Sequence, residues 1–137
     1  MSNNQQSTAD KCEALFAFAA KDQDPVRTRE GERESEGGYV NAWSDATEAW
    51  NLKHGDYIIR ATHVRWQTLN LSADADGTRR ILEILEGDKV IFRARQEGAS
   101  TTKKFSGPDE RYVGTENKPA GTWEVKEGEV PSALNIV

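Results

Sequence analysis

Apolar residues recur at two different spacings along this chain. Near the N-terminus the spacing is i, i+3, i+4 and i+7, as on one face of a helix, and the residues are Cys12, Leu15, Phe16 and Ala19. Ser7, followed three residues later by Asp10, resembles a capping box at the start of this helix. The pattern predicts a helix from Thr8 to about Lys21 whose apolar stripe docks on a sheet, because so short a helix needs tertiary contacts.

From residue 56 onward, apolar and polar residues alternate as in β-strands. Residues 57–71 are long for one strand, and the alternation changes phase within them. Apolar residues occupy odd positions from Tyr57 to Ala61 and even positions at Val64 and Trp66. One extra residue at positions 61–63 would produce this change, so we predict a β-bulge there.

A Gly-Asp pair occurs twice, at residues 55–56 and 87–88, and each copy precedes a β-branched stretch that ends in Arg-Ala. The second pair predicts a hairpin between two strands, 80–85 and 89–96. The two copies differ in length by one residue. Arg60 and Arg93 would therefore face opposite sides of the sheet unless one strand contains a bulge.

The remaining segments predict further short strands and loops. Residues 39–43 read as a strand and residues 44–50 as a short helix capped by Ser44, with a second strand over residues 49–52 as the alternative. Residues 72–77 read as a turn, and the later strands are predicted at 101–105, 111–115 and 122–126. The predicted fold class is mainly β: a small antiparallel barrel or sandwich with one N-terminal helix docked on it.

Polar composition sets the expected domain limits. Residues 1–6 are predicted to be disordered, and residues 22–38, in which Val26 is the one strongly apolar side chain, to form a charged loop. A single mainly-β domain is expected over residues 7–126, and residues 127–137 are expected to form a flexible C-terminal tail.

Composition also limits which cellular compartment and which class of partner are expected. The 137 residues carry a net charge of −5, with a mildly basic centre between acidic ends. The lone Cys12 cannot form an intramolecular disulfide or a cysteine zinc site, which fits a reducing cytoplasm. No secretory signal or membrane span is predicted. A pI of about 5.1 argues against nucleic acid as the partner.

Few residues suggest chemistry. The sequence contains no phosphate-binding loop and no nucleophile motif, so a non-enzymatic role without a cofactor is expected. Residues 72–83 partly match a calcium loop, with Asp74, Asp76 and Glu83 as ligands. The alternative for this segment is an ordinary Asp-Gly surface turn.

Strand arginines and tryptophans suggest a binding surface instead, because both residue types are enriched at interfaces. The predicted binding residues are Arg60, His63, Arg65, Trp66, Arg93 and Arg95. We expect this basic and aromatic sheet face to recognise a protein partner or a second copy of the chain. The alternative is a barrel pocket, in an enzyme or a small-ligand carrier, lined by Tyr57, His63, Arg65 and Trp66.

Overall fold

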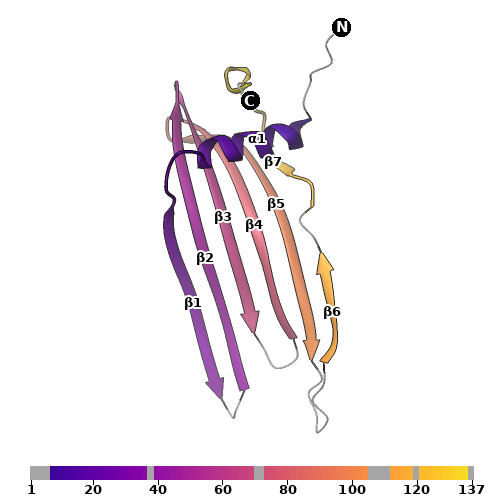
Figure 1. Ribbon diagram of the computed structural model, residues 1–137. Helices are drawn as coiled ribbons and strands as arrows, with labels where there is room; N and C mark the ends of the chain where they lie inside the picture. Colours follow the sequence, from indigo (N-terminus) through magenta and orange to yellow (C-terminus); the bar gives the residue numbers. More distant parts are fainter. Residues whose placement is uncertain (1–6, 37–38, 70–72, 105–111, 119–120, 136–137) are drawn as a thin grey trace.

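The computed structural model describes residues 7–36, 39–69, 73–104, 112–118 and 121–135. These residues form one helix, seven strands and a short 3-10 turn (Figure 1). The elements are α1 (Thr8–Ala20), β1 (Val26–Glu36), β2 (Tyr39–His54), β3 (Tyr57–Leu69), β4 (Ala73–Glu86), β5 (Lys89–Lys104), β6 (Tyr112–Lys118), β7 (Glu124–Gly128) and η1 (Ser132–Leu134).

The strands form one antiparallel sheet in which sequence neighbours are also spatial neighbours, in the order β1-β2-β3-β4-β5-β6. Both β6 and β7 pair with β5, along different parts of it: β7 with residues 92–95 and β6 with residues 99–104. The sheet remains open, since β1 lies at one edge and β6 and β7 lie at the other. The predicted mainly-β class with one helix is confirmed, but the described strands do not close into a barrel.

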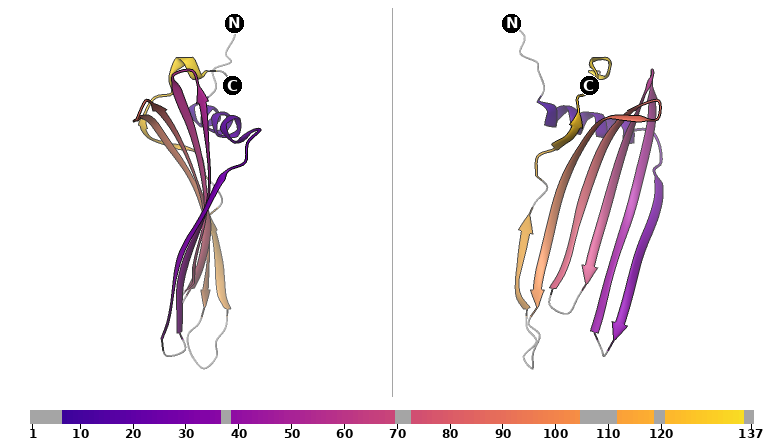
Figure 2. Two further views of the ribbon diagram at one scale, coloured as in Figure 1. Left: turned by 90° about the vertical axis from the view of Figure 1, so that its left-hand side faces the viewer. Right: turned by 180° about the vertical axis from the view of Figure 1, so that it is seen from behind.

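The N-terminal helix forms as predicted. The Ser7 hydroxyl accepts a hydrogen bond from the Asp10 backbone N–H at 3.1 Å and so satisfies one of the free N–H groups of the first turn. The helix buries the predicted apolar stripe, Cys12, Leu15, Phe16 and Ala19. It contacts β2, β3 and β4, and Figure 2 shows that it lies on one side of the sheet near one end.

The hydrophobic core lies between α1 and that end of the sheet. The strands contribute small, branched and aromatic side chains, namely Ile59, Ala61, Leu82, Ile84, Phe92 and Ala94. Two C-terminal residues complete the core: Trp123 and Leu134, which are 7% and 1% exposed. Residues 127–137 were expected to be a flexible tail, but Leu134, in η1, belongs to the core.

The two Gly-Asp pairs form two-residue hairpin turns at the helix end of the sheet (Figure 1). Gly55 and Gly87 have φ values of 61° and 62°, a conformation that glycine adopts without strain. Such turns fit the right-handed twist of the flanking strands. The two Gly-Asp pairs therefore form the same kind of turn in two places.

Strand β5 is irregular where it pairs with β4. Ile84 pairs with Phe92 while Leu85 pairs with Val90, so Ile91 is an extra residue that forms a bulge. Strand β3 pairs with β2 and β4 without any shift, so the bulge predicted at residues 61–63 is wrong. The bulge at Ile91 places Arg93 on the same face as Arg60.

Three predicted breaks are continuous strand in the structure. Residues 26–36 of the predicted charged loop form β1. The sequence pattern did not indicate this strand because its stability comes from cross-strand contacts with β2. One of these contacts is the ion pair of Arg27 with Glu48 at 3.3 Å. Residues 44–50 belong to β2, so the short helix predicted there is wrong. The turn predicted at residues 72–77 is part of β4 from Ala73 onward.

The strands extend well beyond α1, which leaves half of the sheet without a helix on either side (Figures 1 and 2). We call this part the distal sheet, and it comprises residues 27–33, 42–48, 62–69, 74–79 and 97–101. The side of the whole sheet that carries α1 is called the helix face, and the opposite side the bare face. Among the described residues, no helix is long and apolar enough to cross a membrane.

Candidate functional site

The structure divides the six predicted binding residues between the two faces of the sheet. Cross-strand pairing aligns Arg60 with Glu83 and Glu83 with Arg93, so both arginines lie on the bare face. Arg95 and Trp66 lie on that face too, since side chains alternate along each strand. The other two, His63 and Arg65, point to the helix face. A single basic and aromatic surface made of all six residues is therefore not formed.

Carboxylates balance the bare-face arginines at the helix end. Glu83, whose side chain is 14% exposed, lies between Arg93 at 2.9 Å and Arg60 at 3.8 Å. Arg60 also donates to the Asn51 side-chain oxygen at 2.9 Å, and Arg93 reaches Glu127 at 3.6 Å. These residues form a mixed-charge ladder across five strands, which gives this area little net positive charge.

Carboxylates and arginines also pair further toward the distal sheet on the bare face. Glu97 contacts Arg79 at 2.7 Å and Arg95 at 3.6 Å. Sequence reasoning identified Arg95 but not Arg79 or Glu97, and it assigned Glu83 to a calcium loop. The strand register that brings these residues together cannot be read from the sequence. Partly exposed ion pairs of this kind contribute ~0–1 kcal/mol each, so they fix the side chains more than they stabilise the fold.

Beyond these ion pairs the bare face becomes aromatic. Trp66 lies over Gly77 of β4, where an added Cβ would come within 2.6 Å of the indole ring. Val64 is 8% exposed although none of the described elements covers this face, and Trp43 is 39% exposed one row further on. Trp43, Val64 and Trp66 are called the tryptophan patch. It is the apolar surface of the distal sheet.

The helix face of the distal sheet is polar and hollowed. A shallow groove of about 500 Å³ is lined by Arg29, Ser44, Ala46, Arg65, Trp66, Gln67, Asp76, Gly77 and Thr78. Alternation along the strands directs the side chain of Trp66 to the bare face, so this residue and Gly77 border the groove through their backbone. Ala46 is aligned with Arg29 on β1 and with Arg65 on β3. Because the side chain of Ala46 is small, it forms part of the floor of the groove, and the two guanidinium groups flank it. We call this the arginine groove. Asp76, on β4, is the carboxylate in its lining.

Charges next to the groove are also mainly basic. Glu48 faces Arg27 at 3.3 Å and Arg65 at 3.9 Å, and both arginine side chains remain more than 60% exposed, at 68% and 66%. His63 lies 3.9 Å from the same carboxylate. Burial lowers the pKa of His63, as does the nearby Arg65, although Glu48 opposes the shift. The imidazole is therefore neutral at neutral pH, and the arginines carry the positive charge here.

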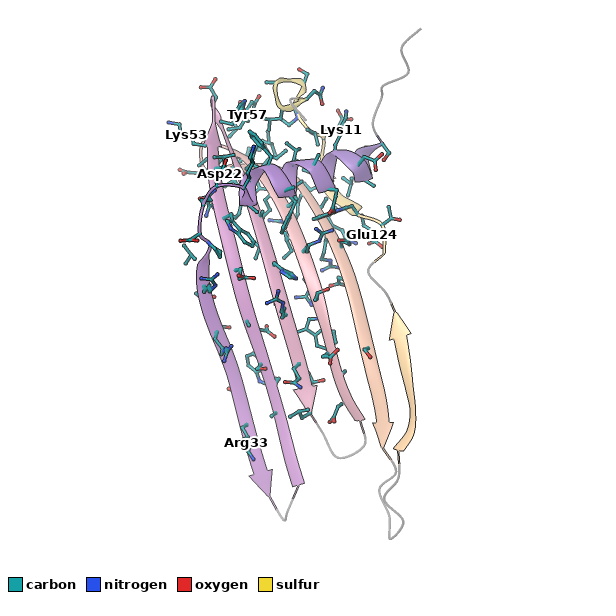
Figure 3. The ribbon with its side chains drawn as sticks, in the orientation of Figure 1. Lys11, Asp22, Arg33, Lys53, Tyr57 and Glu124 are labelled. Carbon is teal, nitrogen blue, oxygen red and sulfur yellow. The ribbon has the colours of Figure 1, made fainter. Side chains whose placement is uncertain are left out.

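The residues of the alternative pocket do not surround a common cavity. Tyr57 is at the helix end of β3 (Figure 3), where it packs against the core. Its strand neighbours His63 and Arg65 share its face but lie further toward the distal sheet, and Trp66 points to the bare face. The geometry therefore separates the four side chains that this alternative needs.

The calcium-loop hypothesis is wrong. Asp74 and Asp76 lie in β4 and share one face, whereas Glu83, seven residues after Asp76, points to the other face. Glu83 is engaged by Arg93 and Arg60. Within the described part of the chain, no three His, Cys, Asp or Glu residues are grouped to hold a metal ion.

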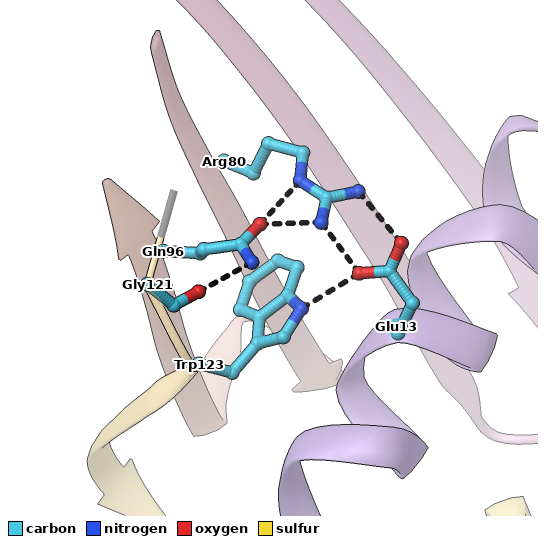
Figure 4. A network of polar contacts seen from close by, with 5 residues as sticks. All are labelled: Glu13, Arg80, Gln96, Gly121 and Trp123. Carbon is cyan, nitrogen blue, oxygen red and sulfur yellow. Dashed lines mark hydrogen bonds and ion pairs between the residues drawn. The ribbon is translucent and has the colours of Figure 1, made fainter. Parts of the chain in front are cut away.

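A polar network that the sequence did not reveal fixes α1 to the sheet (Figure 4). Glu13 of α1 accepts hydrogen bonds from Arg80 at 3.1 Å and from the Trp123 indole N–H at 2.9 Å. Arg80 also donates to Gln96 at 2.7 Å, and its guanidinium lies 5.1 Å from the ring centres of both Phe16 and Trp123. These donors lower the pKa of Glu13, the hydrogen bond from Arg80 having the largest effect. The network positions the helix, and its sheet residues Arg80 and Gln96 lie at the border between α1 and the distal sheet.

In comparisons with known proteins, no family model matches the chain, and no curated protein or solved structure gives a significant match. The candidate site therefore rests on geometry. It consists of the tryptophan patch on the bare face and the arginine groove on the helix face.

Proposed function

We propose that this chain is a cytoplasmic, non-enzymatic protein-binding module and that its partner docks on the distal sheet. The observation that carries this proposal is the change of apolar face along β3. Ile59 and Ala61 point to the helix face and are buried by α1, whereas Val64 and Trp66 point to the bare face. An apolar patch that none of the described segments of the chain covers is typical of an interaction surface.

The shape and composition of the patch favour a protein partner over a small molecule. Small ligands bind in concave sites that enclose most of their surface, whereas Trp43 and Trp66 lie on a sheet face. Tryptophan is also among the residues that contribute most to protein interfaces. Glu32, which pairs with Trp43, and Glu30 and Asp45, which align with Trp66, surround these rings with negative charge. The complementary partner surface is therefore basic around an apolar centre.

A photo-crosslinking amino acid at position 43 tests the proposal in cells that make the protein. We expect a discrete crosslinked protein, which mass spectrometry identifies. The same amino acid at position 53, at the helix end of β2 (Figure 3), is the matched control and should not give that product. Binding of the purified product should then weaken at least ~tenfold in Trp43→Ser, as expected for loss of a central aromatic anchor. Equal crosslinking at both positions, or unchanged affinity, would refute the proposal.

A further inference from the structure

Charges on the edge strand β1 are sorted by sign between the two faces of the sheet. Arg27 and Arg29 align with Glu48 and Ala46, which face the same side as α1. Glu30 and Glu32 align with Asp45 and Trp43 on the bare face. Charges of either sign would protect a sheet edge from unwanted pairing. Edge protection alone therefore does not account for the separation by sign.

The two sides of the distal sheet are complementary to each other. The bare face offers an exposed indole, Trp43, beside the carboxylates of Glu30 and Glu32. The helix face offers a groove of about 500 Å³ with a floor of small side chains flanked by Arg29 and Arg65. An indole between two guanidinium groups also gains a cation–π attraction of ~0.5–2 kcal/mol.

We propose that the partner is a second copy of this chain, joined head to tail. The tryptophan patch of one copy docks in the arginine groove of the next. The carboxylates beside the patch pair with the arginines beside the groove. This inference rests on the proposed function and names the partner that the distal sheet binds.

The charges favour this arrangement over a symmetric dimer. In a symmetric contact between two bare faces, Glu30, Glu32 and Asp45 of one copy would oppose the same carboxylates of the other, which is unfavourable. A contact between unlike faces leaves one bare face and one groove free in every dimer. Such a contact continues into rings or filaments. Because α1 thickens one end of each copy, successive copies would be inclined to each other (Figure 2).

Two charge-reversed variants test the contact, with sedimentation velocity and mass photometry as readouts. The groove variant is Arg29→Glu with Arg65→Glu, and the patch variant is Glu30→Arg with Glu32→Arg. The wild-type chain should form species larger than a dimer, and added salt should dissociate them. Each variant alone should be monomeric, with association weakened at least ~tenfold. The matched control, Lys53→Glu with Lys89→Glu at the helix end, changes the charge equally and should assemble as the wild type does.

Mixing the two variants gives the decisive result. Each retains the surface that the other has reversed, and the two reversed surfaces are also complementary in charge. An equimolar mixture should therefore recover assembly into species larger than a dimer, in which the two variants alternate. A chain that carries all four reversals should recover assembly into species larger than a dimer. Circular dichroism checks that every variant keeps its sheet, as expected for changes at exposed positions.

Three outcomes would overturn the inference: a wild-type chain that is monomeric at every concentration tested, one that stops at a dimer, or a variant mixture that remains monomeric. The crosslinking experiment separates this failure from failure of the proposed function. If position 43 crosslinks to a different protein while the chain is monomeric, the proposed protein-binding function is supported and the proposal that the partner is a second copy is wrong. If position 43 gives no specific crosslink and the chain is monomeric, both proposals fall.

Discussion

Replacing Glu13 by Gln should weaken the attachment of α1 to the sheet in a manner that depends on pH. The substitution keeps the shape of the side chain and removes its charge. Glu13 then loses the ion pair with Arg80, and its hydrogen bond from Trp123 is no longer assisted by charge. The side chain of Glu13 is 55% exposed, so solvent screens these interactions strongly.

The expected loss of unfolding free energy at neutral pH is about 1 kcal/mol. A partly exposed ion pair contributes ~0–1 kcal/mol, and charge assistance of the second hydrogen bond adds a few tenths. Because the pKa of Glu13 in the folded protein lies below its usual value of 4.5, the stabilisation is complete above that value. It disappears as the pH falls through the folded pKa, where the protonated wild-type carboxyl resembles the glutamine of the variant.

Urea unfolding at several pH values, followed by tryptophan fluorescence, measures this difference. The difference in unfolding free energy between the wild type and Glu13→Gln should be largest at neutral pH and should disappear in the acid range. Glu86→Gln, at an exposed carboxylate beside the hairpin turn, is the control and should change the unfolding free energy little at any pH. A gap that persists unchanged at acid pH, or no gap at neutral pH, would refute the assigned role of Glu13.

Three further predictions concern the core and its C-terminal cover. Burial raises the pKa of the Cys12 thiol to about 11, so a thiol reagent should label it at neutral pH only on unfolding; rapid labelling of the native protein would contradict this. Gly128→Ala should cost at least ~2 kcal/mol in urea unfolding, since the residue has φ 72° and its Cβ would lie 1.8 Å from the Ile91 carbonyl oxygen. Faster hydrogen exchange should follow in β7. Phe92→Ala, at a side chain 1% exposed, should lower the unfolding free energy by ~3–5 kcal/mol, and a loss below 1 kcal/mol would show that Phe92 is not central to the core.

Local signals in the sequence predicted the local structure. The helix was recognisable because Ser7 caps it and its apolar residues recur at helical spacing. The hairpin at residues 87–88 was predicted from its Gly-Asp pair between two β-branched stretches. The pair at residues 55–56 was recognised only as the start of a strand, and the structure shows that it also forms a hairpin turn. Strand β1 was missed because its composition resembles a solvated loop. Its stability comes from pairing with β2, which is not a property of residues 26–36 alone.

The candidate site was predictable in its residue types but not in its arrangement. Arg60, Arg93 and Trp66 do share a face, but Arg65 lies on the other. Arg65 and Trp66 are adjacent in one strand, so the alternation of side chains between the two faces would have been enough to predict that they point to opposite sides. The relation between Arg60 and Arg93 depends on the bulge at Ile91, which the apolar pattern of β5 did not indicate.

The change of phase along β3 has a cause other than the expected bulge. A strand covered on one face along its whole length keeps its apolar residues at one parity. Strand β3 is regular, so a change of parity means that the buried face itself changes along the strand. Up to Ala61, α1 provides the cover; from Val64 onward, nothing in the described chain covers the bare face. A pattern that the fold of one chain leaves unexplained becomes consistent if a second protein surface covers Val64 and Trp66, and this is the strongest reason to regard the distal sheet as an interface.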